Sequence, residues 1–291
     1  MIKHIAFIGF GEAGWNFSAG LRETNPDLRI SAYDIRFPND LEAREKAAAL
    51  NVETANAVDA SIVEADIVMS FVVAKASVEV ADASAAVMRA GQVYVDCNST
   101  SPQMKQKVEA AFVGSPVQMV DSAVMSGLPG NRHRVPMNLS GPGAESVAEK
   151  LNALGCVSTA MGETVGAASA LKMMRSVMMK GIDALLLECI QGARHYGAAE
   201  AALASMADAY PGTDWVARAP KSLSRASEHA VRRASEMREV AETLRAVGVE
   251  PLMAEATSRR IAEAEPLIKS NDGKAFATLD DLMAAMARGE R

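Results

Sequence analysis

The chain has 291 residues, of which 49% are apolar and 23% are charged, and its formal net charge is −6. A chain of this length and composition buries about three quarters of its unfolded surface, which excludes disorder of the chain as a whole. The acidic balance argues against nucleic acid as the main partner, because no overall positive field neutralises phosphates.

Cysteine usage and apolar run length bear on location. Three widely spaced cysteines offer neither a disulfide framework nor a zinc motif, so we expect a reducing, cytoplasmic compartment and no metal site. The first apolar run, Ile5–Phe10, leads into a glycine-rich loop, and no run approaches the ~20 apolar residues of a membrane span. We therefore expect no membrane partner.

Short β-rich runs alternate with helical patterns over residues 1–163, which predicts βαβ units and a largely parallel sheet. The expected strands are Lys3–Ile8, Arg29–Tyr33, Ile67–Val73, Gln92–Cys97, Val117–Asp121, Pro136–Ser140 and Cys156–Thr159. The expected helices between them are Glu12–Thr24, Asp40–Leu50, Ser77–Met88, Pro102–Ala111 and Ala144–Leu154.

From Thr164 onward the strand pattern disappears. Val165–Tyr196 is a long apolar run at helical period without proline, and it predicts one long interdomain helix. The sequence therefore predicts an α/β domain at residues 1–163 and an all-helical C-terminal domain at residues 164–291. The further helices expected there are Ala198–Ala209, Thr213–Ala219, Ser222–Val247, Pro251–Glu265 and Thr278–Arg288.

A glycine motif, Gly9-Phe10-Gly11-Glu12-Ala13-Gly14, follows the first strand and opens the first helix. In that context the first glycine permits a tight turn, the second lets the backbone approach a pyrophosphate, and the third allows close helix–strand packing. The pyrophosphate would be held by the helix N-terminus. An ordinary turn is the alternative, but the motif in this place favours a Rossmann dinucleotide-binding domain.

Two charged residues after the second strand bear on the choice of dinucleotide. Asp34 lies where an acidic residue binds a ribose 2′-hydroxyl, which favours NAD because a carboxylate repels a 2′-phosphate. Arg36, two residues further, offers a partner for that phosphate and keeps NADP open.

A lysine near the start of the long helix is a candidate proton donor. Lys172, Ser176, Met179 and Asp183 share one helical face. Desolvation among apolar neighbours lowers the pKa of an ammonium and makes proton exchange near neutrality feasible. The alternative is a lysine whose stem covers apolar surface, and periodicity alone favours that alternative.

Further motifs follow the glycine motif in the chain, in the order Asp96-Cys97-Asn98-Ser99-x-x-Pro102, Asp121–Gly127, Gly166 and Lys172. Motifs in this order resemble the β-hydroxyacid dehydrogenases, a superfamily that includes 3-hydroxyisobutyrate dehydrogenase, tartronate semialdehyde reductase and 6-phosphogluconate dehydrogenase. The resemblance spans essentially the whole chain. The segments around Lys172 and Arg232–Met237 look closest to a poorly characterised, phosphogluconate-dehydrogenase-like branch.

The resemblance implies roles for individual positions of the first domain. The three glycines of the motif and Asp34 would hold the dinucleotide, and Val72, Val73 and Ala74 would border the nicotinamide ribose. Asn98 and Ser99 would lie beside the nicotinamide. Met125, Ser126 and Gly127 would form the loop that binds a substrate carboxylate, with Met125 replacing the usual serine and Ser126 the first glycine.

The resemblance also implies roles on the long helix. Lys172 matches the catalytic lysine, and Ser176 stands where an asparagine usually orients the substrate hydroxyl. The second domain would bind a small anionic substrate and pair with a second copy, giving a homodimer.

Three functions follow from these implications. The first is an NAD(P)-dependent oxidoreductase that interconverts a small hydroxy acid and its oxo or semialdehyde form, with Lys172 as general acid/base. The second is oxidative decarboxylation of a β-hydroxy acid, and the third is a sensor that binds the dinucleotide without turnover. Outside the motifs, His133 is expected either in a lid or in an exposed loop. Arg232 and Arg233 are expected on a solvated helical face, with contact to a substrate anion as the alternative.

Overall fold

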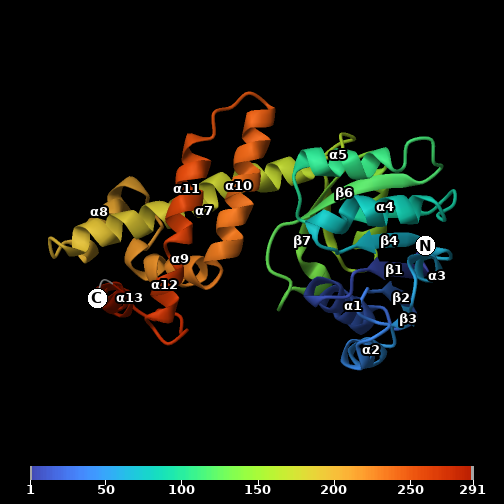
Figure 1. Ribbon diagram of the computed structural model, residues 1–291, viewed down its shortest axis with the longest axis horizontal. Coiled ribbons are helices and arrows are strands. Elements are labelled where there is room, and N and C mark those ends of the chain that lie inside the picture. The colour runs from blue at the N-terminus through green and yellow to red at the C-terminus, as the bar shows by residue number, and fades with distance from the viewer. Residues whose placement is uncertain (1, 290–291) are drawn as a thin grey trace. The chain divides into compact units, whose positions relative to one another are not determined.

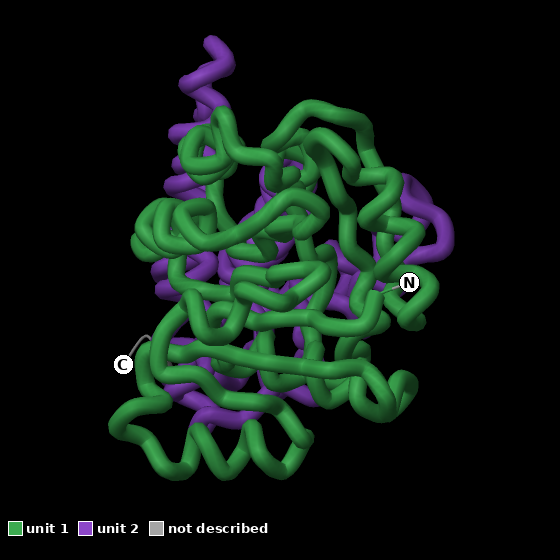
Figure 2. Tube along the Cα trace, turned by 90° about the vertical axis from the view of Figure 1, so that its right-hand side faces the viewer, with its two compact units in different colours: residues 1–172 green, residues 173–291 purple. Residues whose placement is uncertain are grey.

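The computed structural model describes residues 2–289 and falls into two compact units, residues 1–172 and 173–291 (Figures 1 and 2). The division lies inside one long helix, α7 (Ala167–Arg194), whereas the sequence places it just before Thr164. The first six residues of α7 therefore belong to the α/β unit.

The first unit contains one eight-stranded sheet in the order β3-β2-β1-β4-β5-β6-β7-β8. Its first six strands are parallel, and β7 runs antiparallel to β6 and parallel to β8. The strands are β1 (His4–Ile8), β2 (Arg29–Tyr33), β3 (Glu53–Ala55), β4 (Ile67–Ser70), β5 (Val93–Asp96), β6 (Gln118–Val124), β7 (Pro136–Ser140) and β8 (Val157–Ala160).

Helices cover both faces of this sheet, as expected for a parallel sheet whose strands are buried on two sides. On β1, Ile5 and Phe7 join the core formed with α1, α2 and α6, while Ala6 and Ile8 join the core formed with α3, α4 and α5. The helices are α1 (Glu12–Thr24), α2 (Leu41–Ala48), α3 (Val58–Ile62), α4 (Ser77–Ala85), α5 (Pro102–Ala110) and α6 (Ala144–Asn152), with short 3₁₀ turns η1 (Ala74–Ala76) and η2 (Arg132–Arg134).

The sequence did not predict β3 and α3. β3 has three residues, two of them exposed, so it carries no alternating apolar pattern. It exists because its backbone pairs with β2, with Ser31 opposite Glu53 and Tyr33 opposite Ala55. An edge strand of this kind is determined by its neighbour and not by its own residues.

The second unit is all-helical, as predicted, but the short helix α12 was not predicted and one helix break differs. The sequence predicts a break at Pro220, yet α9 continues through this residue, whose ring is buried, and the break comes at His229. Proline there removes only one helical hydrogen bond, to the carbonyl one turn back. The helices are α7, α8 (Ala199–Ala209), α9 (Trp215–Glu228), α10 (Ala230–Ala246), α11 (Leu252–Ala262), α12 (Glu265–Lys269) and α13 (Leu279–Gly289).

Apolar side chains of α7, α8, α9, α12 and α13 form the main core of this unit, with Trp215 and Leu223 of α9 among its buried members. α10 and α11 pack against each other as a helical hairpin (Figure 1). Within residues 2–289, no helix combines the length and the hydropathy needed to cross a membrane.

His133 corrects an expectation from the sequence, because it lies neither in a lid nor in an exposed loop. Its ring is 2% exposed and packs on α1, where a Cβ at Gly20 would come within 2.2 Å of the His133 Nδ1 atom. The His133 Nε2 atom shares a 3.2 Å hydrogen bond with the Thr24 hydroxyl. Burial, together with the charges of Arg134 and Arg132, lowers the pKa of His133.

The buried histidines make stability depend on pH. The pKa of His133, and that of His4 by the same burial, lies below its unfolded value of 6.5, so the unfolded chain binds more protons as pH falls below that value. The free energy of unfolding should therefore decrease from pH 7.5 to 5.5, by at most about 1.4 kcal/mol per pH unit for each histidine. Urea unfolding at several pH values measures this, and the decrease should be smaller in His133→Gln than in the exposed control His229→Gln. Equal decreases in both variants would show that His133 does not carry the effect.

Candidate functional site

The glycine motif forms a tight turn between β1 and α1. The Gly9 amide donates to the Tyr33 carbonyl at 2.8 Å, and φ of Gly9 is +88°, a conformation that favours glycine. A Cβ at Gly9 would lie 2.3 Å from the Phe71 carbonyl oxygen, and a Cβ at Gly14 would lie 2.4 Å from the Gly9 oxygen. Both positions therefore exclude a side chain by close backbone approach.

Gly11 has a different role from its two neighbours. It is the N-cap of α1, makes no side-chain capping hydrogen bond, and has no atom within 4 Å of the place where a Cβ would lie. The space in front of the first turn is thus open to a ligand, and backbone N–H groups of a helix N-terminus attract phosphate. Ala13 is half-buried and Glu12 is exposed in the first turn. These features fit the pyrophosphate of a dinucleotide.

Asp34, directly after β2, connects the motif to Arg36. Its Oδ2 atom accepts from the Phe10 amide at 2.7 Å, and its two oxygens accept from Arg36 Nε at 2.9 Å and Arg36 Nη2 at 3.1 Å. Burial opposes the charged form, but the Arg36 side chain and the amides of Arg36 and Phe10 lower the pKa of Asp34. Asp34 is thus an ionised acceptor beside the loop, already paired with a half-exposed guanidinium.

The ends of β4 and β5 are joined by Asn98. Its Oδ1 atom accepts from the Val72 amide at 2.6 Å, and its Nδ2 group donates to the Ser70 hydroxyl at 3.2 Å. Asn98 is only 3% exposed, so its amide fixes the segment that follows β4. That segment presents Val73, which is 62% exposed, and Ala74, which opens η1.

Lys172 contacts Ser99 just beyond the carboxyl end of β5. The Lys172 ammonium donates to the Ser99 hydroxyl at 3.2 Å, although 73 residues separate them in the chain. Ser99 follows β5 and is exposed, whereas Lys172 is half-buried in the second turn of α7. The structure therefore brings the predicted lysine to the end of a strand that is adjacent to β4.

The loop after β6 is tethered at both ends. The Met125 amide donates to the Pro136 carbonyl at 2.9 Å, and the Asn131 side chain donates to the Gly127 carbonyl at 2.8 Å. Ser126 and Gly127 are exposed between these tethers. A short exposed loop with a small residue and a glycine can present backbone amides to an anion.

Ser176 belongs to the second unit, one turn along α7 from Lys172. There it accepts a 3.2 Å hydrogen bond from Lys180, which is 8% exposed and pairs with Glu236 at 2.9 Å. Lys180 was not predicted as a site residue, although it lies one turn after Ser176 on the same helix.

Arg233 corrects another expectation, since it does not lie on a solvated face. Its guanidinium pairs with Asp183, a carboxylate that is 5% exposed and whose pKa burial raises even though Arg233 opposes the shift. Arg232, by contrast, is 64% exposed and pairs with Glu236 one turn along α10.

The first unit also contains a buried charged cluster that was not predicted from the sequence. Lys105 of α5, Asp96 of β5 and Asp121 of β6 are each 0% exposed, and the Lys105 ammonium lies 3.3 Å and 3.2 Å from the two carboxylates. The sequence marks Asp96 and Asp121, which belong to the motifs of the resemblance and end predicted strands, but nothing near Lys105 marks it as buried.

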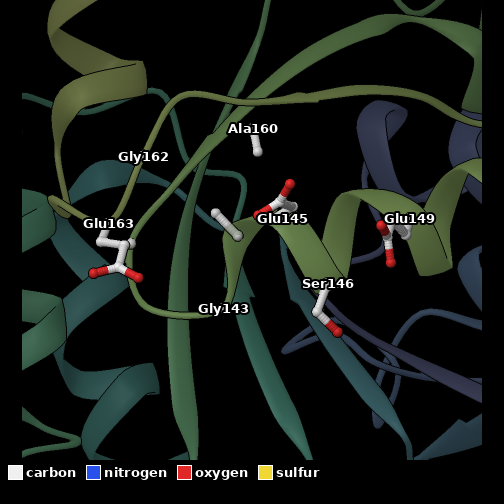
Figure 3. A pocket seen from close by; sticks show the side chains of 9 residues that line it. Gly143, Glu145, Ser146, Glu149, Ala160, Gly162 and Glu163 are labelled. Atoms are coloured by element: carbon white, nitrogen blue, oxygen red, sulfur yellow. The ribbon is translucent and has the colours of Figure 1, made fainter.

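A cavity of about 550 Å³ lies elsewhere on this unit, beside α6 and β8 (Figure 3). Its wall includes the carboxylates of Glu145, Glu149 and Glu163, and no residue of the predicted site lines it. Negative charge there repels an anionic ligand. In the part of the chain that the structure describes, no group of three or more histidine, cysteine or acidic residues is arranged to hold a metal ion.

Comparison with known proteins adds to this geometry. Residues 4–166, more than half of the chain, match the model of the NAD-binding domain of 6-phosphogluconate dehydrogenase. The chain belongs to this family. Residues 193–264 match a domain of unknown function, DUF1932.

Solved structures agree with the assignment. A conserved hypothetical protein from Sinorhizobium meliloti 1021 is 38% identical, with 99% of this chain and 97% of that chain covered and a TM-score of 0.86. The conserved protein MTH1747, described as structurally similar to 3-hydroxyacid dehydrogenases, is 26% identical over 98% and 99% of the two chains, with a TM-score of 0.78.

A more distant structure shows the fold alone. The 3-hydroxyisobutyrate dehydrogenase of Mycobacterium tuberculosis is 16% identical over 99% of both chains, with a TM-score of 0.76. The chain therefore combines a Rossmann NAD(P)-binding domain with an all-helical domain in a 3-hydroxyacid dehydrogenase-like fold.

Gly11 gives a test of the dinucleotide site that is separate from folding. In Gly11→Ala the methyl enters open space, so thermal unfolding should be unchanged while the Kd for NADH and NADPH rises at least about tenfold. Quenching or enhancement of the reduced dinucleotide's fluorescence measures the Kd. Gly14→Ala should also lower the unfolding midpoint, because its Cβ meets the Gly9 oxygen.

The matched control is Gly192→Ala, a glycine on α7 with equally open surroundings and no place in the loop. If Gly11→Ala binds both dinucleotides as tightly as this control, the α1 N-terminus does not receive the pyrophosphate.

Proposed function

We propose that this protein is an NAD(P)-dependent oxidoreductase that interconverts a small hydroxy acid and its oxo or semialdehyde form. The observation that supports the proposal best is the 3.2 Å contact between Lys172 Nζ and Ser99 Oγ. The contact lies at the carboxyl ends of β4 and β5, the two strands that follow β1 in the sheet. Ligands of open α/β sheets bind at the carboxyl ends of the strands.

Carbonyl reduction needs a hydride at the carbonyl carbon and a proton at the carbonyl oxygen. A bound nicotinamide dinucleotide supplies or accepts the hydride. Lys172 donates the proton to the substrate oxygen in reduction and removes it in oxidation, acting as the general acid/base. While charged, its ammonium also stabilises the negative charge that develops on that oxygen. Ser99, hydrogen-bonded to Lys172, orients the ammonium before substrate binds.

The remaining site residues recognise the substrate in this proposal. Backbone amides around Ser126 and Gly127 hold a carboxylate, and Met125 contributes no hydroxyl to it. Ser176 contributes a hydroxyl to the reacting oxygen in place of the usual asparagine. The predicted substrate is accordingly small and anionic.

NAD is the proposed dinucleotide. The lowered pKa of Asp34 keeps its carboxylate ionised, and an ionised carboxylate accepts ribose hydroxyls and repels a 2′-phosphate. Arg36 partly offsets this repulsion, because it neutralises Asp34 through two hydrogen bonds. Removal of Arg36 by Arg36→Ala should therefore weaken NADP binding more than NAD binding.

The enzymatic proposal is tested with purified protein and a panel of small hydroxy acids, with NAD⁺ and NADP⁺ supplied separately. The wild type should reduce the dinucleotide with at least one acid, and Lys172→Ala should lower kcat by at least about 10²-fold while the dinucleotide Kd stays the same, since only the proton transfer is lost.

Other outcomes of the same assay decide between the alternatives. Equal yields of carbon dioxide and reduced dinucleotide would identify oxidative decarboxylation. Tight dinucleotide binding without turnover of any acid would favour a sensor. Full activity in Lys172→Ala would contradict the role of the lysine while leaving the dehydrogenase activity in place.

We also propose a homodimer formed through the helical domain. Met174, Met178 and Leu185 lie along one face of α7 in this domain and are 38%, 66% and 59% exposed. Apolar side chains repeated at this spacing form a stripe that a second copy can cover. Sedimentation should give a dimer for the wild type and a monomer for Met178→Glu, with Lys221→Glu on the exposed surface of α9 as the matched control. A monomeric wild type would contradict the proposal.

A further inference from the structure

The buried cluster of Lys105, Asp96 and Asp121 adjoins the proposed site, because Asp96 ends β5 three residues before Ser99. Asp96 and Asp121 are opposite one another on the parallel strands β5 and β6. The Lys105 ammonium lies between them and also donates to the Asp96 carbonyl oxygen at 2.7 Å. Two carboxylates and one ammonium are thus enclosed with no exposed surface.

The two carboxylates have different surroundings. Asp121 accepts from four donors, which are Lys105, the Ser140 hydroxyl, and the amide and hydroxyl of Ser169. Asp96 accepts from the Asn98 amide at 2.9 Å, and its Oδ2 atom has no hydrogen-bond partner. Burial raises the pKa of Asp96, with the neighbouring Asp121 adding to the shift and Lys105 opposing it. Asp121 therefore has the larger set of hydrogen-bond donors, while the Lys105 ammonium lies at nearly the same distance from both carboxylates.

Asp121 in turn fixes the start of α7. Its Oδ2 atom accepts from the Ser169 amide at 3.0 Å, and its Oδ1 atom accepts from the Ser169 hydroxyl at 2.8 Å. The Ser140 hydroxyl, which donates to Asp121, accepts from the Ala168 amide at 3.0 Å. Two amides of the first helical turn are satisfied in this way, and a buried carboxylate there interacts favourably with the helix dipole.

Lys172 follows Ser169 by three residues, so it lies on the same face of α7, about one turn further. Its hydrogen-bond partner Ser99 lies three residues after Asp96. Lys105 donates to the Asp96 carbonyl oxygen, and the Asp96 side chain accepts from the Asn98 amide. One buried ammonium thus connects both sides of the Lys172–Ser99 contact. The β5 side is connected through Asp96 and the α7 side through Asp121.

We propose that Lys105 and Asp121 are positioning residues, which hold Lys172 against Ser99 by linking the end of β5 to the first turn of α7. This inference rests on the proposed function, because a positioned lysine acts only if Lys172 transfers a proton. A displacement of about 1 Å in a reacting group costs about 10²-fold in rate. A rigid connection between the two sides keeps the ammonium where the substrate oxygen binds.

The test compares four variants of the full chain. Ser169→Ala removes one donor to Asp121 without leaving a buried charge, Asp121→Asn removes the charge at nearly constant shape, and Lys105→Met removes the ammonium. Lys107→Met is the matched control, since Lys107 is an exposed lysine on the same helix. Ser169→Ala keeps the test valid if the two charge variants fail to fold.

Besides the thermal unfolding midpoint, three quantities are measured on each folded variant. The dinucleotide Kd should stay within about twofold of the wild type, because the glycine loop takes no part in the cluster. With a substrate from the panel, kcat should fall about tenfold in Ser169→Ala and about 10²-fold in Asp121→Asn and Lys105→Met. The control should keep the kcat of the wild type.

The third quantity does not depend on turnover. Acetic anhydride at low concentration modifies amines, and mass spectrometry of peptides gives the rate at Lys172 relative to the exposed Lys150. A lysine released from Ser99 should react several-fold faster relative to Lys150 in the three cluster variants and at the wild-type rate in Lys107→Met.

The outcomes separate this inference from the proposed function. If the wild type turns over no acid but Lys172 is modified faster in the cluster variants, the proposed function fails and the positioning stands. If folded variants show a lower unfolding midpoint with unchanged kcat and unchanged Lys172 modification, the cluster only stabilises the fold and the inference is overturned.

Discussion

An ammonium enclosed between two carboxylates is the interaction on which the carboxyl ends of β5 and β6 and the start of α7 depend. Lys105 is wholly buried, and so are Asp96 and Asp121 on either side of it. Removing one partner from such a pair leaves an uncompensated buried charge and costs about 3–5 kcal/mol, whereas an apolar replacement of the whole set is often tolerated. What charged groups provide here, and an apolar core lacks, is direction, because both Asp121 oxygens and the Asp96 Oδ1 atom have defined donors. These hydrogen bonds hold the carboxyl end of β5, strand β6 and the first turn of α7 together.

The opposite side of the dinucleotide site is built from close backbone approach instead of charge. Gly9 and Gly14 have no room for a side chain, so β1, β4 and α1 come together as closely as their backbones allow. Asp34 then accepts from the Phe10 amide inside this turn. The glycine turn is fixed by close backbone contacts, and Lys172 is positioned by the buried charged cluster. Both lie on the same sheet, but their contacts are separate.

Much of the first unit was predictable because its periodicity is local. Glu12–Thr24 and Arg29–Tyr33 were predicted with the bounds that the structure shows, since apolar spacing and a glycine before the helix mark them. The long helix was placed within two residues at each end, because an apolar stretch without proline has no competing interpretation. Failures occurred where a neighbour decides, as for β3, which pairs with β2, and for α9, whose buried Pro220 packs within the helix.

The sequence by itself determined the class of the protein: the glycine turn, the alternation of strands and helices, and a lysine at the start of a long helix. These depend on residues close together in the chain. Only the tertiary structure decided that Lys172 meets Ser99 across 73 residues, that His133 packs on α1, and that Lys105 is buried between two aspartates. The local residue pattern indicates which face of a helix or strand is apolar. Whether a charged side chain or a histidine is buried depends on contacts with other strands and helices, which lie far away in the chain.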